Sequence, residues 1–137
     1  MSTRRRGREY VLKALYAYEQ GEQTREEIIQ SILEDGGLDK RTLAFARSLF
    51  VAVTDNILKI DVYIRSLATN WEIDRIAVVD KNILRIAICE IQSMPDVPMK
   101  VAVNEAIEMA KKYSTYESAS FVNGIMNRVL HDHEKPV

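Results

Sequence analysis

The chain has 137 residues, of which 47% are hydrophobic, and a net charge of −1, so one folded domain with its own core is expected. Its single cysteine, Cys89, excludes an intrachain disulfide and fits a reducing compartment. No apolar run approaches the roughly 20 residues that span a bilayer, and the first residues lack the apolar centre of a signal peptide, so we expect a cytoplasmic protein without a membrane segment.

Positive charge is concentrated at the N-terminal end. The first 13 positions hold five basic residues and one acidic residue, for +4, whereas the other residues carry −5. Most of the cluster consists of Arg4, Arg5, Arg6 and Arg8. Guanidinium groups remain charged at physiological pH and present planar pairs of donors to phosphate. The cluster alone supports a phosphate-binding surface and a solubilising N-terminus equally.

Apolar residues recur at helical spacing and no strand-like alternation of any length occurs, so we predict an all-α fold of about six to seven helices. The first helix should begin near Thr3 and stop at Gly21. A second should open at Thr24, with Glu27 completing a capping box, and end at the glycine pair 36–37.

The middle of the chain predicts a division into two parts. Apolar positions continue without a breaker over 39–67, which indicates one long helix or two nearly collinear helices. Residues 70–76 interrupt the pattern, and Trp71 is large enough to anchor a turn there. We therefore expect a single domain, 1–137, with helical subdomains at 1–69 and 70–137.

Two further helices are expected in the second half. The segment 79–94 is apolar on more than one face, as is typical of a helix central to its bundle, and Cys89 should be buried and inert within it. Pro98 suits the first turn of the next helix because its missing amide hydrogen costs nothing there. Lys111 and Lys112 would end that helix, favourably placed against its dipole.

The last helix should open with Ser114 and Glu117 as a capping box and run to about Leu130, leaving a frayed tail from residue 131. Gly124 falls in the middle of this helix, where glycine costs about 1 kcal/mol relative to alanine. It would allow either close packing of another helix or close approach of a ligand, and the packing role is favoured because it needs only the helix bundle.

Groups suited to catalysis are few. His131 and His133 have no further ligand spaced to complete a metal site, and Glu105 and Glu108 fit a solvated helix face. No glycine-rich phosphate loop is present. We therefore expect neither an enzyme nor a metal or cofactor, and binding remains as the function. The rings that can stack on an unpaired base, unless they belong to the core, are those of Tyr10, Tyr16, Tyr113, Tyr116 and Phe121.

Several stretches together resemble the NusB family of transcription antitermination proteins. RRRGRE at 4–9, followed by ALY at 14–16, is similar to the family's opening. The more specific matches are DVP at 96–98, KVAVNEAIE at 100–108, AK at 110–111 and FVNG at 121–124, with DK at 80–81 and LRIA at 84–87 between the two ends. The resemblance covers nearly the whole chain.

This resemblance implies two small helical subdomains and a function other than catalysis. It implies binding of the boxA element of nascent RNA together with NusE, a ribosomal small-subunit protein. With RNA polymerase, such an assembly reads through terminators in ribosomal RNA operons. Both a monomer and a homodimer are compatible with the family. The alternative is a helical protein-interaction module that does not bind RNA directly.

The resemblance also implies site residues. Carried over by position, the RNA surface would include the four N-terminal arginines together with Glu117 and Phe121. Because Phe121 lies at helical spacing with Ile125 and Val129, a core position is the alternative for its ring. The NusE surface would include Tyr16 and Asp80. Gly7 weakens the first helical turn, so we expect the arginine-rich end to order only when RNA binds.

Overall fold

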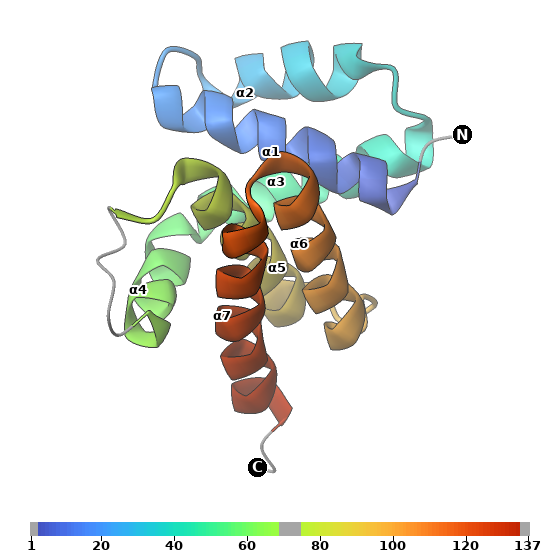
Figure 1. Ribbon diagram of the computed structural model, residues 1–137. Coiled ribbons are helices and arrows are strands. Elements are labelled where there is room, and N and C mark those ends of the chain that lie inside the picture. The colour runs from blue at the N-terminus through green and yellow to red at the C-terminus, as the bar shows by residue number, and fades with distance from the viewer. Residues whose placement is uncertain (1–2, 69–74, 135–137) are drawn as a thin grey trace. The chain divides into compact units, whose positions relative to one another are not determined.

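A computed structural model describes residues 3–68 and 75–134 of the chain (Figure 1). These residues form α-helices and no β-strand, which confirms the predicted all-α fold. The helices are α1 (Arg4–Gln20), α2 (Arg25–Ile28), α3 (Lys40–Asp55), α4 (Ile57–Leu67), α5 (Val78–Ser93), α6 (Met99–Tyr113) and α7 (Tyr116–Glu134). None of them is long and apolar enough to span a bilayer.

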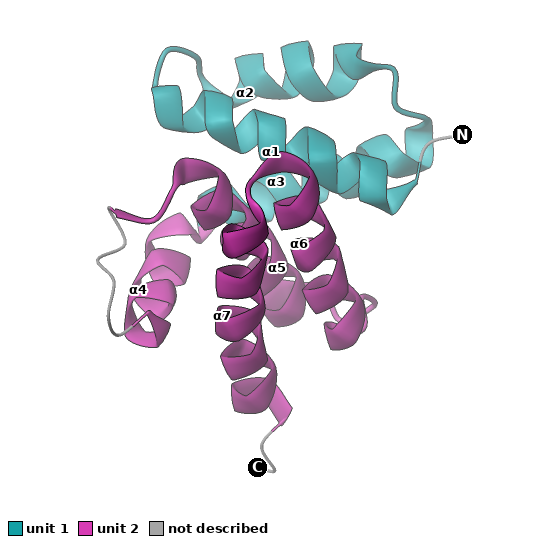
Figure 2. Cartoon of the chain, in the orientation of Figure 1, with its two compact units in different colours: residues 1–55 teal, residues 56–137 magenta. Residues whose placement is uncertain are grey.

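The chain divides into two compact units (Figure 2), Met1–Asp55 with α1 to α3 and Asn56–Val137 with α4 to α7. The division differs from the boundary expected between 69 and 70. The helical pattern over 39–67 is interrupted at Asn56, whose φ of −115° and ψ of 13° are not helical, so α3 and α4 are separate helices. The predicted turn around Trp71 lies outside the described residues, except for its last two positions.

In the first unit, α1 begins and ends as predicted. The Thr3 side chain accepts a hydrogen bond from the Arg6 amide at 3.2 Å, and Gly21 adopts the left-handed conformation with a φ of 74°. The expectation that Gly7 loosens the first turn was wrong. Gly7 is buried in α1, and a Cβ there would lie 3.2 Å from side-chain atoms of both Phe45 and Thr42, so the missing side chain lets α1 pack closely on α3.

The second helix starts as predicted and then changes form. Thr24 and Glu27 make the capping box, but α2 has only four residues before a π-helical turn at Ile29–Leu33 and a 3-10 turn at Glu34–Gly36. A Cβ at Gly36 would overlap the Tyr10 ring, and the Tyr10 hydroxyl donates to the Gly36 carbonyl at 2.9 Å. Tyr10 therefore fastens this segment to α1.

In the second unit, α5 packs against α4, α6 and α7, which confirms its predicted central position. Its completely buried residues are Ile83, Leu84, Ile86 and Ile88. Cys89 is 1% exposed, and burial raises the pKa of its thiol to about 11, so the thiol is held in its unreactive protonated form.

The buried surface of α5 also carries an arginine. Arg85 donates through Nε and Nη2 to the two carboxylate oxygens of Asp61 at 2.8 and 2.7 Å, and through Nη1 to Asn82 Oδ1 at 2.8 Å. The Arg85 side chain is buried and Asp61 belongs to α4. This two-pronged ion pair joins the two helices through charge as well as through apolar packing.

The last helix departs from prediction at both ends. Thr115 rather than Ser114 caps it, since the Ser118 amide donates to Thr115 Oγ1 at 3.0 Å, so the expected capping box with Glu117 was wrong. The helix continues to Glu134, past the expected end near Leu130. The residues expected to fray are therefore helical as far as they are described.

Candidate functional site

The N-terminal arginines lie on the first two turns of α1, in the first unit. Arg4, Arg5 and Arg6 are exposed, whereas Arg8 is only 3% exposed. The guanidinium carbons of Arg4 and Arg8 lie 4.6 and 5.2 Å from the centroid of the Phe45 ring. Spaced four apart, these two arginines contact one ring from successive turns. Arg8 therefore belongs to the packing beneath the cluster rather than to its exposed surface.

Tyr10 holds a second pair of basic side chains. Arg6 Nη2 donates to the Tyr10 hydroxyl at 3.2 Å, and its guanidinium carbon lies 5.5 Å from the ring centroid. The hydrogen bond raises the pKa of Arg6 above its already high usual value. Lys13 Nζ lies 4.8 Å from the same ring. We call the exposed group Arg4, Arg5, Arg6 and Lys13 the basic surface.

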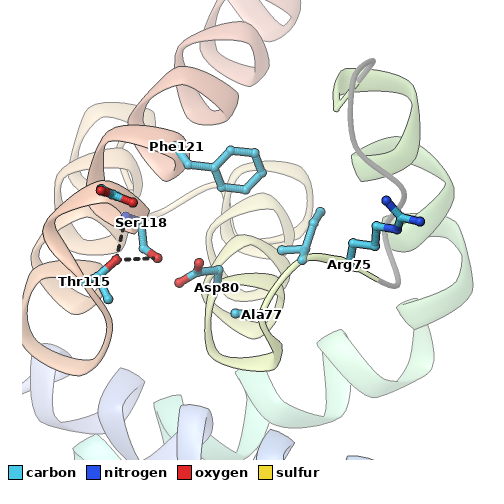
Figure 3. A pocket seen from close by; sticks show the side chains of 8 residues that line it. Arg75, Ala77, Asp80, Thr115, Ser118 and Phe121 are labelled. Atoms are coloured by element: carbon cyan, nitrogen blue, oxygen red, sulfur yellow. Dashed lines mark hydrogen bonds between the residues drawn. The ribbon is translucent and has the colours of Figure 1, made fainter.

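The second unit contains a pocket of about 250 Å³ (Figure 3). We call it the α5–α7 pocket because residues at the beginnings of those helices line most of it. Its lining consists of Arg75, Ile76, Ala77, Asp80, Thr115, Glu117, Ser118 and Phe121. It thus brings together Asp80, Glu117 and Phe121, three of the residues singled out from sequence. The resemblance had divided them between RNA and NusE.

The pocket has a flat apolar wall and an acidic one. Phe121 is half-buried and its ring extends from α7 over the opening, whereas Asp80 points in from α5 (Figure 3). The ring is therefore not fully enclosed in the core. Thr115 and Ser118 hydrogen-bond to each other through their hydroxyls at 3.1 Å, at the beginning of α7.

Asp80 is the unusual member of this lining. It is 5% exposed, and its Oδ1 atom is buried with no hydrogen-bond partner in the part of the chain that the structure describes. As the third residue of α5, its carboxylate is favoured by the positive end of the helix dipole. Tyr16, by contrast, is 52% exposed on α1. Tyr16 can meet a protein surface directly, whereas Asp80 is reached only by a group that enters the pocket.

Gly124 does not have the packing role expected from sequence. It is exposed in the middle of α7, and a Cβ there would have no atom within 4 Å among those described. Neither its backbone conformation nor a neighbouring helix requires a glycine, so the helix-contact interpretation was wrong. It lies one turn beyond Phe121, on the same side of α7.

The family model and the most similar curated proteins point to the same family. Residues 5–131 match the model of the NusB family. The transcription antitermination protein NusB of Myxococcus xanthus is 39% identical over 140 residues, covering 99% of this chain and all of that protein. The NusB protein of Chloroherpeton thalassium is 42% identical over 131 residues, covering 95% of this chain but only 62% of that longer protein.

Solved structures of NusB proteins have the same fold as this chain. NusB of T. maritima matches with a TM-score of 0.89 at 37% identity, over 98% of this chain and 94% of that one. A structure of antitermination factors NusB and NusE in complex with double-stranded RNA matches with a TM-score of 0.85 over 94% of this chain and 96% of that one; at 22% identity it supports the fold alone. The chain belongs to the NusB family, whose members are transcription antitermination factors and not enzymes.

Proposed function

We propose that the chain binds boxA-type single-stranded nascent RNA together with NusE and supports read-through transcription of ribosomal RNA operons in the cytoplasm. The observation that carries the RNA claim is the basic surface, where basic side chains are exposed on one short helical stretch of an otherwise acidic protein. Membership of the NusB family of transcription antitermination factors supports this function. A protein of the same fold is bound to NusE and double-stranded RNA in a solved complex. RNA polymerase would be engaged through that assembly.

The solvent exposure of each side chain indicates its role in the RNA site. Arg4, Arg5 and Arg6 present charge to phosphates, while Arg8 contributes indirectly by packing against Phe45. Phosphate contacts carry no base identity, so selection of the RNA sequence falls to other groups. We assign stacking of a splayed base to Phe121, with Glu117 beside it at the pocket.

For NusE, we assign direct contact to Tyr16, whose exposed ring on α1 offers both apolar area and a hydroxyl. Asp80 joins that interface only through a donor that enters the α5–α7 pocket. A helical interaction module without direct RNA binding is the second candidate. It is favoured by exposed Leu58 and Val62, one turn apart on α4, which would also serve a homodimer.

Replacing both Arg5 and Arg6 by alanine tests the RNA claim. Binding of a boxA-like RNA should weaken about tenfold at low salt, the equivalent of about 1.4 kcal/mol. The slope of log K against log salt should flatten by roughly 1.4, because two phosphate contacts on a single strand are lost. Fluorescence anisotropy at two or more salt concentrations, with and without NusE, measures both quantities.

The matched control is Lys59→Ala, which removes one positive charge from an exposed position on α4. Its affinity and salt slope should remain those of the unmodified chain. If the Arg5→Ala/Arg6→Ala variant also keeps the original affinity and slope, direct RNA binding by this surface is excluded and the interaction-module function is favoured.

A further inference from the structure

The Phe45 ring lies against the first two turns of α1 and meets that helix at three positions. Phe45 belongs to α3, in the same compact unit as α1, and is 8% exposed. The guanidinium carbons of Arg4 and Arg8 lie over the ring, 4.6 and 5.2 Å from its centroid. Between them in the sequence, a Cβ at Gly7 would lie 3.2 Å from the Phe45 Cδ2 atom. The beginning of α1 is therefore fitted closely to this one ring.

Arg4 is the exposed cation on the ring, and its place in the helix makes a support useful. It is the first residue of α1, and the amide groups of a first helical turn have no acceptors within the helix. Ordering a long arginine side chain costs conformational entropy, which weakens binding when the ordering happens only on contact with the ligand. A ring that already holds the Arg4 guanidinium lowers that cost.

The ring contact is compatible with phosphate binding by the same guanidinium. A guanidinium meets an aromatic ring through its face, whereas its N–H donors lie in its plane and point outward from its edges. A phosphate accepts from those edges. Arg8, by contrast, is only 3% exposed, so RNA does not reach it directly. Of the two cations on the ring, Arg4 is thus the one that can present donors to a strand.

We propose that Phe45 is a positioning residue for RNA binding, whose ring holds the Arg4 guanidinium in the orientation that meets a phosphate. The inference rests on the proposed RNA-binding function and adds to it a residue outside the arginine cluster. Phe45 contributes to affinity and not to base identity, because the phosphate is the same at every nucleotide. The alternative is a core residue without this role, and the two differ in whether the effect of the ring depends on Arg4.

Phe45→Leu, alone and combined with Arg4→Ala, tests that dependence. Phe45→Leu should weaken binding of a boxA-like RNA about threefold to fivefold, the effect of losing one partly exposed cation–π contact. The phosphate contact can still form, so the slope of log K against log salt should stay the same, whereas Arg4→Ala should flatten it by roughly 0.7. In the Arg4→Ala background, Phe45→Leu should cause no further loss. Fluorescence anisotropy on the full chain measures these quantities.

A single-stranded oligouridine is the second probe, because it has the same phosphodiester backbone without the boxA sequence. Phe45→Leu should weaken binding of oligouridine and of boxA-like RNA by the same factor. A loss confined to the boxA-like RNA would mean that the ring influences base selection, and it would overturn the assignment to a phosphate contact.

The matched control is Phe50→Leu, the same substitution on the same helix. Phe50 is completely buried, and its ring meets that of Tyr18 edge-on, with centroids 6.2 Å apart. Its Tm should fall at least as far as that of Phe45→Leu, while its RNA affinity remains that of the unmodified chain. An equal loss of RNA affinity in both variants would attribute the effect to loosening of the first unit and would overturn the proposal.

A fluorinated ring separates the charge of the ring face from its packing. Phe45 is replaced, by amber-codon suppression, with a trifluorophenylalanine that carries fluorine at Cζ and both Cε atoms. This change removes most of the negative charge from the ring face and leaves the Cδ atoms near Gly7 unchanged. RNA affinity should fall as in Phe45→Leu while the Tm stays close to that of the unmodified chain. Unchanged affinity contradicts the proposal, even if Phe45→Leu does not fold.

The outcomes distinguish this inference from the proposed function. If the unmodified chain binds neither probe at low salt, RNA binding fails and the role of Phe45 fails with it. If binding depends on Arg4 but folded Phe45→Leu binds normally, RNA binding stands and Phe45 is a core residue only. If Phe45→Leu lowers affinity equally with and without Arg4, the ring acts through the fold rather than through that arginine, and the proposal is wrong.

Discussion

Asp61→Ala should destabilise the second unit by about 3 kcal/mol or more, because it removes the carboxylate that pairs with the buried guanidinium of Arg85. The variant loses both hydrogen bonds from Arg85 to the Asp61 carboxylate, while the hydrogen bond from Arg85 to Asn82 remains. The Arg85 side chain is 5% exposed, so water cannot replace the two lost bonds without opening the packing between α4 and α5. Urea denaturation followed by circular dichroism at 222 nm measures the change.

The matched control is Asp55→Ala. It breaks a similar pair with Arg25, but both of those side chains are substantially exposed, so the loss should be below about 1 kcal/mol. The double variant Asp61→Leu/Arg85→Met removes both buried charges and should recover most of the stability. Equal losses for Asp61→Ala and Asp55→Ala would show that burial does not strengthen the Arg85 pair.

Gly36→Ala should cost about 2 kcal/mol of stability, since its methyl group overlaps the Tyr10 ring in a packed segment. It should also weaken RNA binding, although Gly36 is outside the basic surface. Displacing Tyr10 removes the ring that holds Arg6 and Lys13 in place. Urea denaturation and RNA anisotropy on the same sample measure the two effects.

Gly37→Ala separates backbone strain from the displacement of Tyr10. Gly37 has a φ of 81°, and a Cβ there meets no atom within 4 Å among those described. Alanine in this left-handed conformation costs roughly 1 to 2 kcal/mol, but Tyr10 keeps its position and RNA affinity should be unchanged. Equal losses of RNA affinity in the two glycine variants would remove Tyr10 from the explanation.

Local sequence signals predicted much of the fold because they act within one helical turn. The Thr3 and Gly21 caps and the Thr24–Glu27 capping box need only side chains and backbone three residues apart. The central position of α5 followed from apolar residues on several of its faces, which no surface helix tolerates. These features depend little on the rest of the molecule.

The misplaced features depend on backbone geometry or on distant neighbours. Apolar spacing continues across Asn56, so the pattern could not show that one residue leaves the helical conformation there. Gly7 and Gly124 both lower helix propensity at their positions, so the sequence does not distinguish them. Gly7 lies against α3, whereas Gly124 faces open space. Only tertiary structure distinguishes them.

The candidate site also depends on contacts between distant residues, which the sequence alone did not predict. The sequence indicates an arginine cluster, but a spacing of four between Arg4 and Arg8 does not reveal that both would lie on Phe45 and that Arg8 would be buried. Likewise, Asp80 and Phe121 are 41 positions apart, and the packing of α5 with α7 brings them to one pocket. Which ligand each residue meets therefore cannot be assigned from its position in the chain.

The buried cysteine allows the opening of the second unit to be measured by chemical modification. Cys89 is the chain's one thiol and lies in the central helix of the second unit, so an alkylating reagent can modify it only when that unit opens. When closing is faster than alkylation, the modification rate in native buffer reports the free energy of opening without added denaturant or label. The first unit has no cysteine and contributes nothing to the alkylation signal, so the assay measures opening of the second unit separately from the first.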